Sequence, residues 1–188
     1  MVIPIVIVPS VWWVSMIVIG ITAVIVITTL LILERFAFYS PFFVQKKPHE
    51  VVISFIIFFI VMAGLTGFFY GYRGGDNKYY VIISILAWSL GDAAASIFGH
   101  IWGKHKVKGK LIEGSKSVEG SVACLAIVFT FSFMMLLFLM QYVWWIALLA
   151  SISLGIGVSL TELFTKKGLD NFTCPLIAGI ILFLFSLI

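Results

Sequence analysis

The sequence predicts an all-α integral membrane protein, and three observations support this fold class. Of the 188 residues, 62% are hydrophobic and only 11% are charged, which is more apolar side chain than a soluble core of this size can bury. The chain also contains six long apolar runs separated by short polar segments. Finally, ten of the twelve Lys and Arg residues fall on one side of these runs when the runs are taken as membrane spans. We expect one domain, residues 1–188, folded as a polytopic helical bundle.

The six runs have suitable lengths, because a helix needs about 20 apolar residues to cross a hydrocarbon core of about 30 Å. Pro4 and Pro9 indicate that the first helix starts after them. No Lys or Arg precedes the first run, so we expect a retained anchor and not a signal peptide. The expected transmembrane helices are about 11–33, 51–70, 79–101, 122–139, 143–163 and 172–188.

Positive charge predicts the orientation, because cytoplasmic loops of membrane proteins are enriched in Lys and Arg. Only Arg73 and Lys78 lie on one side of the expected helices. The other side carries Arg35, Lys46, Lys47, Lys104, Lys106, Lys108, Lys110, Lys116, Lys166 and Lys167. We therefore expect loops 34–50, 102–121 and 164–171 in the cytoplasm and both termini outside. We expect this membrane to be the cell membrane, or that of the endoplasmic reticulum if the protein is eukaryotic. The net charge of +4 does not indicate nucleic-acid binding, because Lys and Arg in such a chain follow membrane orientation.

Asp92 is the most informative residue of the third apolar run. It lies about 15 Å from the cytoplasmic end of the expected helix. A carboxylate at that depth costs about 2.5–3.5 kcal/mol on insertion scales, so it should face a protein interior or a wet cavity. Ser96, Gly99 and Gly103 follow at helical spacing on the same face. Helix packing explains these glycines as well as a binding site does, but it does not explain Asp92.

The loop after this helix has two features that suit phosphate. Lys104, Lys106, Lys108 and Lys110 alternate with other residues, which fits a short hairpin turning near Gly109 or an ordinary positively charged loop. The segment 114–117, Gly-Ser-Lys-Ser, then opens the next helix. Main-chain N–H groups at a helix N-terminus bind phosphate readily, and here Ser115, Lys116 and Ser117 stand beside them.

Asp170 and Asn171 begin the last apolar run, where they are candidates for capping its helix. The alternative is that Asp170 joins Asp92 around a divalent ion. Carboxylate oxygens with retained water suit Mg²⁺ held against phosphates. Carboxylates and many lysines on one side of the membrane are typical of a nucleoside triphosphate site.

Three motifs together resemble a known enzyme family. They are GDAAASIFGHIWGKHKVKG from Gly91, GSKSVEGS from Gly114, and DNFTCPL from Asp170, the last preceded by Glu162. The chain resembles the dolichol kinase, phytol kinase and CTP-dependent diacylglycerol kinase family, which is related to the CDP-diacylglycerol synthases. The longer histidine, glycine and Asp-Arg signature of those synthases is missing here, which favours the kinases.

The resemblance implies transfer of the CTP γ-phosphate to a lipid alcohol. It implies functional roles for Asp92, Lys116, Ser117, Glu119, Gly120, Asp170 and Asn171. As a hypothesis, Asp92 and Asp170 hold Mg²⁺ against the triphosphate, which Lys116, Ser117 and the lysines of loop 104–110 cradle. Glu119 or Glu162 orients ligands, or one carboxylate accepts the hydroxyl proton.

We expect a polyprenol-type alcohol, dolichol or a related isoprenoid, as the lipid substrate. Phytol, geranylgeraniol and diacylglycerol are the alternative alcohols. A cytidylyltransferase that makes a CDP-lipid is a second hypothesis, and a non-enzymatic transporter or assembly subunit with Asp92 as an intramembrane relay is a third. The sequence leaves the oligomeric state open.

Overall fold

The computed structural model describes residues 11–34, 49–74, 77–107, 116–165 and 169–188. Within these ranges the chain forms six α-helices and one π-helical segment, and it forms no strand. Five helices, counting the π-helical segment with the α-helix before it, are long and apolar enough to cross a membrane. The predicted fold class, an all-α membrane protein, is confirmed.

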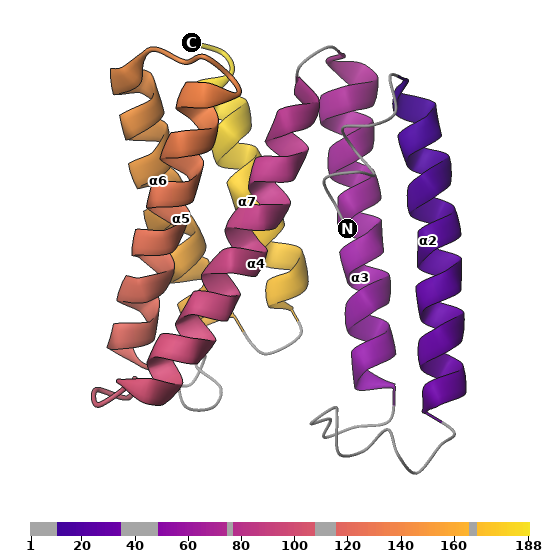
Figure 1. Ribbon diagram of the computed structural model, residues 1–188, viewed down its shortest axis with the longest axis horizontal. Coiled ribbons are helices and arrows are strands. Elements are labelled where there is room, and N and C mark those ends of the chain that lie inside the picture. Colours follow the sequence, from indigo (N-terminus) through magenta and orange to yellow (C-terminus); the bar gives the residue numbers. More distant parts are fainter. Residues whose placement is uncertain (1–10, 35–48, 75–76, 108–115, 166–168) are drawn as a thin grey trace.

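The helices alternate in direction along the chain (Figure 1). In order they are α2 (Trp12–Leu33), α3 (Glu50–Leu65), the π-helix η1 (Thr66–Tyr72), α4 (Lys78–Ile101), α5 (Val118–Phe138), α6 (Trp144–Phe164) and α7 (Asp170–Phe185). Helix α7 begins two residues before the expected start at 172, so Pro175 lies inside the helix and not in its first turn. With 16 residues, α7 is about 24 Å long and is shorter than each of the five helices that are long enough to cross a membrane.

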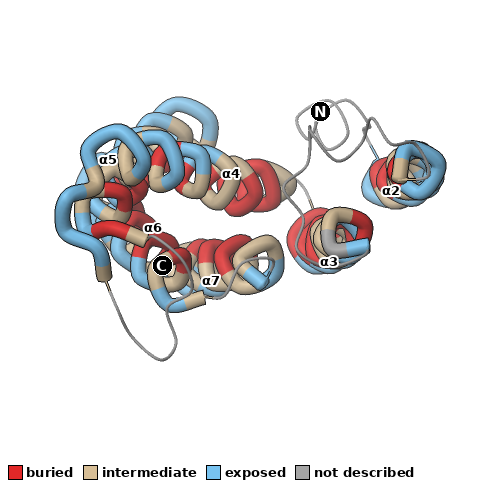
Figure 2. The backbone as a smooth tube through the Cα atoms, turned by 90° about the horizontal axis from the view of Figure 1, so that it is seen from below, coloured by how far each residue is buried: buried red, intermediate tan, exposed pale blue. Residues whose placement is uncertain are grey.

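Helices α4 to α7 form a four-helix bundle, in which α4 and α6 each pack against both α5 and α7. Figure 2 shows the buried residues turned toward the centre of this bundle, with α2 and α3 beside it. Ile82, Leu154 and Leu182 are completely buried in its core. Among the described helices, α2 packs mainly against α3 and η1, and 11% of its apolar segment is buried, compared with 44% for α4. The bundle therefore carries the core, and α2 lies at the edge.

The seam between α4 and α5 is close because glycines face the neighbouring helix. A Cβ atom on Gly91 would lie 2.9 Å from Cys124 Sγ, and one on Gly120 would lie 2.7 Å from the carbonyl oxygen of Ala95. Real Cβ contacts are not this short, so a larger residue would push the two helices apart. The two glycines thus set the spacing of the helices that flank the cavity described below.

The segment η1 continues α3 with a wider helical turn. Thr66, at its start, donates its hydroxyl to the Met62 carbonyl at 2.8 Å. Gly71 makes room for the indole of Trp12, since a Cβ there would lie 3.1 Å from the ring. Helix α2 is therefore held at its amino-terminal end by an aromatic ring that sits over a glycine.

The loops after α4 and α6 lie at one end of the molecule, and the last residue lies at the other (Figure 1). Exposed Trp12 and Trp144 begin helices at the end opposite these loops, while exposed Trp102 follows the last turn of α4. Tryptophan is enriched where a helix leaves the hydrocarbon, so these rings mark both interfaces.

Candidate active site

A cavity of about 530 Å³ lies at the loop end of the four-helix bundle. This volume falls within the range of about 300–1,000 Å³ that is typical of small-molecule sites. Its wall comes from α4 and the segment after it, from the start of α5, the end of α6 and the first residue of α7. The cavity is lined by Asp92, Ala95, Ser96, Gly99, His100, Gly103, Lys106, Lys116, Ser117, Gly120, Ser121, Glu162 and Asp170.

Helix α4 supplies the longest wall of the cavity. Asp92, Ser96, Gly99 and Gly103 all line it, on the face that their spacing predicts. His100 lies on the same face, four residues after Ser96, and was not expected at the site. The same spacing would have pointed to it. Asp92 is partly buried, and its carboxylate stands about two turns deeper than the mouth of the cavity.

The start of α5 closes the cavity on the loop side. Ser117 caps this helix, because its hydroxyl accepts a hydrogen bond from the Gly120 N–H at 3.2 Å. The N–H of Val118 donates to the His105 carbonyl at 3.0 Å. Two first-turn N–H groups that we expected to face phosphate are thus already bonded within the protein. The helix end attracts an anion through its dipole instead.

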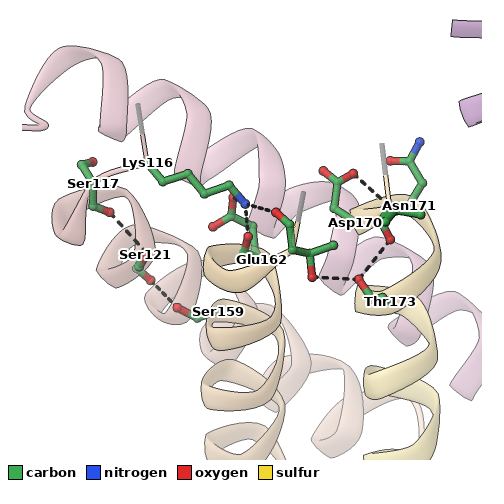
Figure 3. A network of polar contacts seen from close by, with 10 residues as sticks. Lys116, Ser117, Ser121, Ser159, Glu162, Asp170, Asn171 and Thr173 are labelled. Atoms are coloured by element: carbon green, nitrogen blue, oxygen red, sulfur yellow. Dashed lines mark hydrogen bonds and ion pairs between the residues drawn. The ribbon is translucent and has the colours of Figure 1, made fainter. Parts of the chain in front are cut away.

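Lys116, just before α5, forms an ion pair with Glu162 of α6, with Nζ 3.0 Å from Oε1 (Figure 3). Their side chains are only 12% and 9% exposed. The Lys116 ammonium also donates to the main-chain carbonyls of Glu162 and Thr165, the latter at 2.9 Å. An ammonium has three N–H donors, and these contacts occupy all of them. Lys116 therefore ties the end of α6 to α5, and a phosphate oxygen would have to replace one of these partners.

Helix α7 places Asp170 and Asn171 on different sides of its first turn (Figure 3). Asp170 lines the cavity, and its Oδ1 accepts the Asn171 N–H at 3.1 Å. The Asn171 side chain turns the other way, and its Nδ2 lies 3.4 Å from the carbonyl oxygen of Ser54 in α3. Asn171 thus joins α7 to α3 and does not line the cavity.

Two other residues that the sequence singled out, Lys104 and Glu119, lie outside the cavity lining. Lys104 is exposed and does not line the cavity. Glu119 pairs with His105, whose Nδ1 lies 2.7 Å from Oε1, and is also absent from the lining. Ser115 and the turn expected near Gly109 lie outside the described residues.

The carboxylates of the cavity fit a cation only when phosphate supplies further ligands. In the part of the chain that the structure describes, no three His, Cys, Asp or Glu side chains gather closely enough to hold a metal ion. Asp92 and Asp170 line the same cavity from different helices. Mg²⁺ is ordinarily held by one or two carboxylates together with substrate phosphates and water. The donor set therefore fits Mg²⁺ that arrives with a phosphorylated substrate.

Comparison with known proteins gives one match. A model of the cytidylyltransferase family matches residues 1–165, most of the chain and all of α4, α5 and α6. This family includes polyprenol and dolichol kinases and CDP-diacylglycerol synthases, which use CTP in lipid-related reactions. Neither the search of curated proteins nor the search of solved structures returned a match. The chain therefore belongs to the cytidylyltransferase family.

Proposed function

We propose that the protein is a CTP-dependent lipid kinase, which transfers the γ-phosphate of CTP to the hydroxyl of a polyprenol-type alcohol at the cytoplasmic face. One observation carries the proposal: Asp92 and Asp170 line a single cavity with Lys106 and Lys116, at the end of the bundle where α4 and α6 finish. This end is the one that a membrane lipid and a water-soluble nucleotide can both reach.

The charge of the cavity supports a magnesium nucleotide. Three carboxylates and two lysines line it, so its formal charge is −1 with His100 neutral, and one carboxylate is paired with Lys116. A triphosphate would be repelled by such a site unless it carried its own cation. When bound, Mg²⁺ supplies neutralisation of the phosphate oxygens. Asp92 and Asp170 are the residues that would hold it.

The remaining roles belong to side chains of the bundle. Lys106 is exposed and lines the cavity, where its ammonium binds the triphosphate. The dipole of α5 also favours an anion at this end of the helix. The lipid hydroxyl oxygen attacks the γ-phosphorus, the bond to the β–γ bridging oxygen breaks, and CDP leaves. Asp92 or Asp170 accepts the hydroxyl proton. Glu162 is the poorer candidate for this role, because its Oε1 already lies 3.0 Å from Lys116 Nζ in an ion pair.

A second candidate is a cytidylyltransferase, because the matched family includes CDP-diacylglycerol synthases as well as kinases. The match ends at residue 165, so it covers the parts that both activities share and leaves out the Asp170–Pro175 motif that resembles the kinases. In this reaction a lipid phosphate attacks the α-phosphorus of CTP, and pyrophosphate leaves. No hydroxyl proton has to be accepted, so the second carboxylate would serve only in binding.

Labelled CTP separates the two reactions. Purified full-length protein in lipid nanodiscs is given Mg²⁺ and CTP labelled at either the α- or the γ-phosphorus, with dolichol, phytol, geranylgeraniol, diacylglycerol or phosphatidic acid as acceptor. A kinase moves the γ-label into lipid and releases CDP. A cytidylyltransferase moves the α-label into lipid and releases pyrophosphate.

The substrate panel also tests the choice of alcohol and of nucleotide. We expect the highest kcat/KM with a polyprenol-type alcohol, and a lower value when ATP or GTP replaces CTP. A γ-label that enters only diacylglycerol would keep the kinase and overturn the polyprenol assignment. Transfer of neither label to any acceptor would overturn both proposed reactions.

A further inference from the structure

The segment between α4 and α5 folds back on itself at the mouth of the cavity. Lys106 and Ser117 face each other as an antiparallel pair. Two main-chain hydrogen bonds flank the pair, from the Val107 N–H to the Lys116 carbonyl at 2.9 Å and from the Val118 N–H to the His105 carbonyl at 3.0 Å. Such short pairing is weak by itself, because an isolated two-stranded ribbon is marginally stable in water.

The carboxylate of Glu119 strengthens this pairing from one side. It accepts the main-chain N–H of His105 at 3.1 Å and 3.3 Å, one distance for each oxygen. Its Oε1 also lies 2.7 Å from His105 Nδ1. Glu119 is in the first turn of α5, so its negative charge also interacts favourably with the positive end of the helix dipole. One side chain thus fixes both the backbone and the ring of the residue that begins the ribbon.

The alternation of an extended segment explains which side chains reach the cavity. Successive side chains point to opposite faces, and the two members of a non-hydrogen-bonded pair share one face. Lys106 and Ser117 therefore lie together, and both line the cavity. The His105 side chain faces the other way and is 81% exposed. The Glu119 side chain pairs with His105 on this other face. It is 26% exposed and does not line the cavity.

We propose that Glu119 and His105 form a clasp that holds Lys106 and Ser117 at the mouth of the cavity, so that Glu119 is a positioning residue and not a catalytic one. The inference rests on the proposed function, because the clasp is proposed to position Lys106 next to the triphosphate of CTP. A carboxylate that already accepts three hydrogen-bond contacts from one residue is poorly placed to accept a substrate proton as well.

The variant Glu119→Gln separates the two roles. The amide keeps the shape of the side chain but cannot accept at both of its terminal atoms. We expect the KM for CTP to rise about tenfold, the scale of one charge-assisted hydrogen bond, while kcat changes less than about threefold. General acid or base catalysis contributes about 100- to 10,000-fold, so a kcat loss of that size with an unchanged KM would make Glu119 catalytic and overturn the clasp.

The variant His105→Ala tests the other half of the clasp without touching the charge at the start of α5. Because the His105 side chain is exposed, its loss should leave the fold intact and raise the KM for CTP in the same way. The double variant should have a KM for CTP no higher than that of the more impaired single variant, because both substitutions disrupt the same contact. Additive losses would overturn the clasp.

A second histidine–glutamate pair supplies a matched control. His49 Nδ1 lies 2.6 Å from Glu34 Oε2, at the loop end of α2 and α3, and neither residue lines the cavity. His49→Ala should leave the KM for CTP unchanged, and an equal rise would overturn the special role of His105. CTP-dependent thermal stabilisation of the unaltered protein is measured first. Its absence would refute the proposed function, whereas its presence with equal CTP affinity in all the variants would refute the clasp alone.

Discussion

Among single residues, Asp92 has the clearest role, because its depth in α4 demands a reason that packing does not give. It is partly buried about two turns from the mouth of a polar cavity, on a helix whose other end is apolar. An ionisable residue placed in this way within a membrane helix ordinarily serves function.

Asp92→Asn keeps the size of the side chain and removes its charge. We expect turnover to fall at least about 100-fold, because the variant loses a base or a cation ligand. The measurement is transfer of labelled phosphate to lipid, with gel filtration in detergent to show that the fold is kept. Glu34→Gln, which alters a carboxylate outside the cavity, should retain near-normal turnover. Normal activity in Asp92→Asn would remove Asp92 from the mechanism.

Lys116 and Glu162 should behave as one unit. Lys116→Met leaves a carboxylate that is 9% exposed without its cation, which ordinarily costs about 3–5 kcal/mol of unfolding free energy. Adding Glu162→Gln should recover much of this loss, because the buried charge is then gone. Equilibrium unfolding in detergent of the two single variants and the double variant measures the coupling. Equal stability of Lys116→Met and the unaltered protein would contradict the role of Lys116 as a tie.

At the scale of elements, the seam between α4 and α5 determines the shape of the site. Both helices line the cavity, and glycines on each side bring them close. Gly99 and Gly120 meet across this seam and also line the cavity, so close packing and the shape of the cavity depend on the same positions. A Cβ on Gly103 would lie 2.1 Å from the Gly99 carbonyl oxygen, so the chain after α4 also depends on a missing side chain.

Gly120→Ala tests the seam. The new methyl group would lie 2.7 Å from the Ala95 carbonyl oxygen, and overpacking of this kind costs about 1–3 kcal/mol. We expect a lower midpoint of thermal unfolding and a higher KM for CTP. Gly20→Ala is the matched control in α2, since a Cβ there meets nothing within 4 Å, and its stability should not fall. Equal effects of the two substitutions would contradict the seam as the cause.

At the scale of the whole molecule, the cavity belongs to the four-helix bundle and not to the peripheral hairpin of α2 and α3. All lining residues of the cavity come from α4 to α7 and the segment between α4 and α5. Helices α2 and α3 contribute none, although Asn171 ties α3 to the bundle through the Ser54 carbonyl. The proposed chemistry therefore depends on the bundle, whereas exposed apolar side chains such as Ile25 in α2 and Ile97 in α4 face the bilayer on both parts of the molecule.

The orientation is testable by thiol labelling. Cys124 and Cys174 are buried, so an impermeant maleimide in intact cells should not label the unaltered protein. Exposed Gln141 precedes α6 at the end opposite the cavity, and Gln141→Cys should be labelled from outside. Lys104→Cys, at the cavity end, should be labelled only after the cells are opened. The reverse pattern would place the site on the outer face.

The sequence foretells those parts of the structure that depend on local periodicity. Apolar runs of sufficient length predict the membrane helices, and spacing of three and four residues places Asp92, Ser96 and Gly99 on one wall. Helix length and the faces of a helix can be predicted in this way because they depend on residues that are close together in the sequence.

Contacts between distant segments escape such reading. Lys116 and Glu162 are 46 residues apart, and the sequence around Lys116 does not show that its ammonium would donate to α6. His105 and Glu119 are 14 residues apart across a loop, so their pairing depends on a register that the lysine alternation only partly indicates. The π-helix Thr66–Tyr72 has the apolar composition of an ordinary membrane helix, so the sequence does not reveal its wider turn or the contact of Gly71 with the distant Trp12.

The exposed mouth of the cavity has a consequence for fidelity. His100 and Lys106 line the cavity and are exposed, so bulk water reaches the same space as the triphosphate. Water then competes with the lipid hydroxyl as an acceptor, and a kinase built in this way should slowly hydrolyse CTP to CDP and inorganic phosphate when lipid is absent. The ratio of phosphate released to lipid phosphorylated measures how well a bound alcohol displaces solvent.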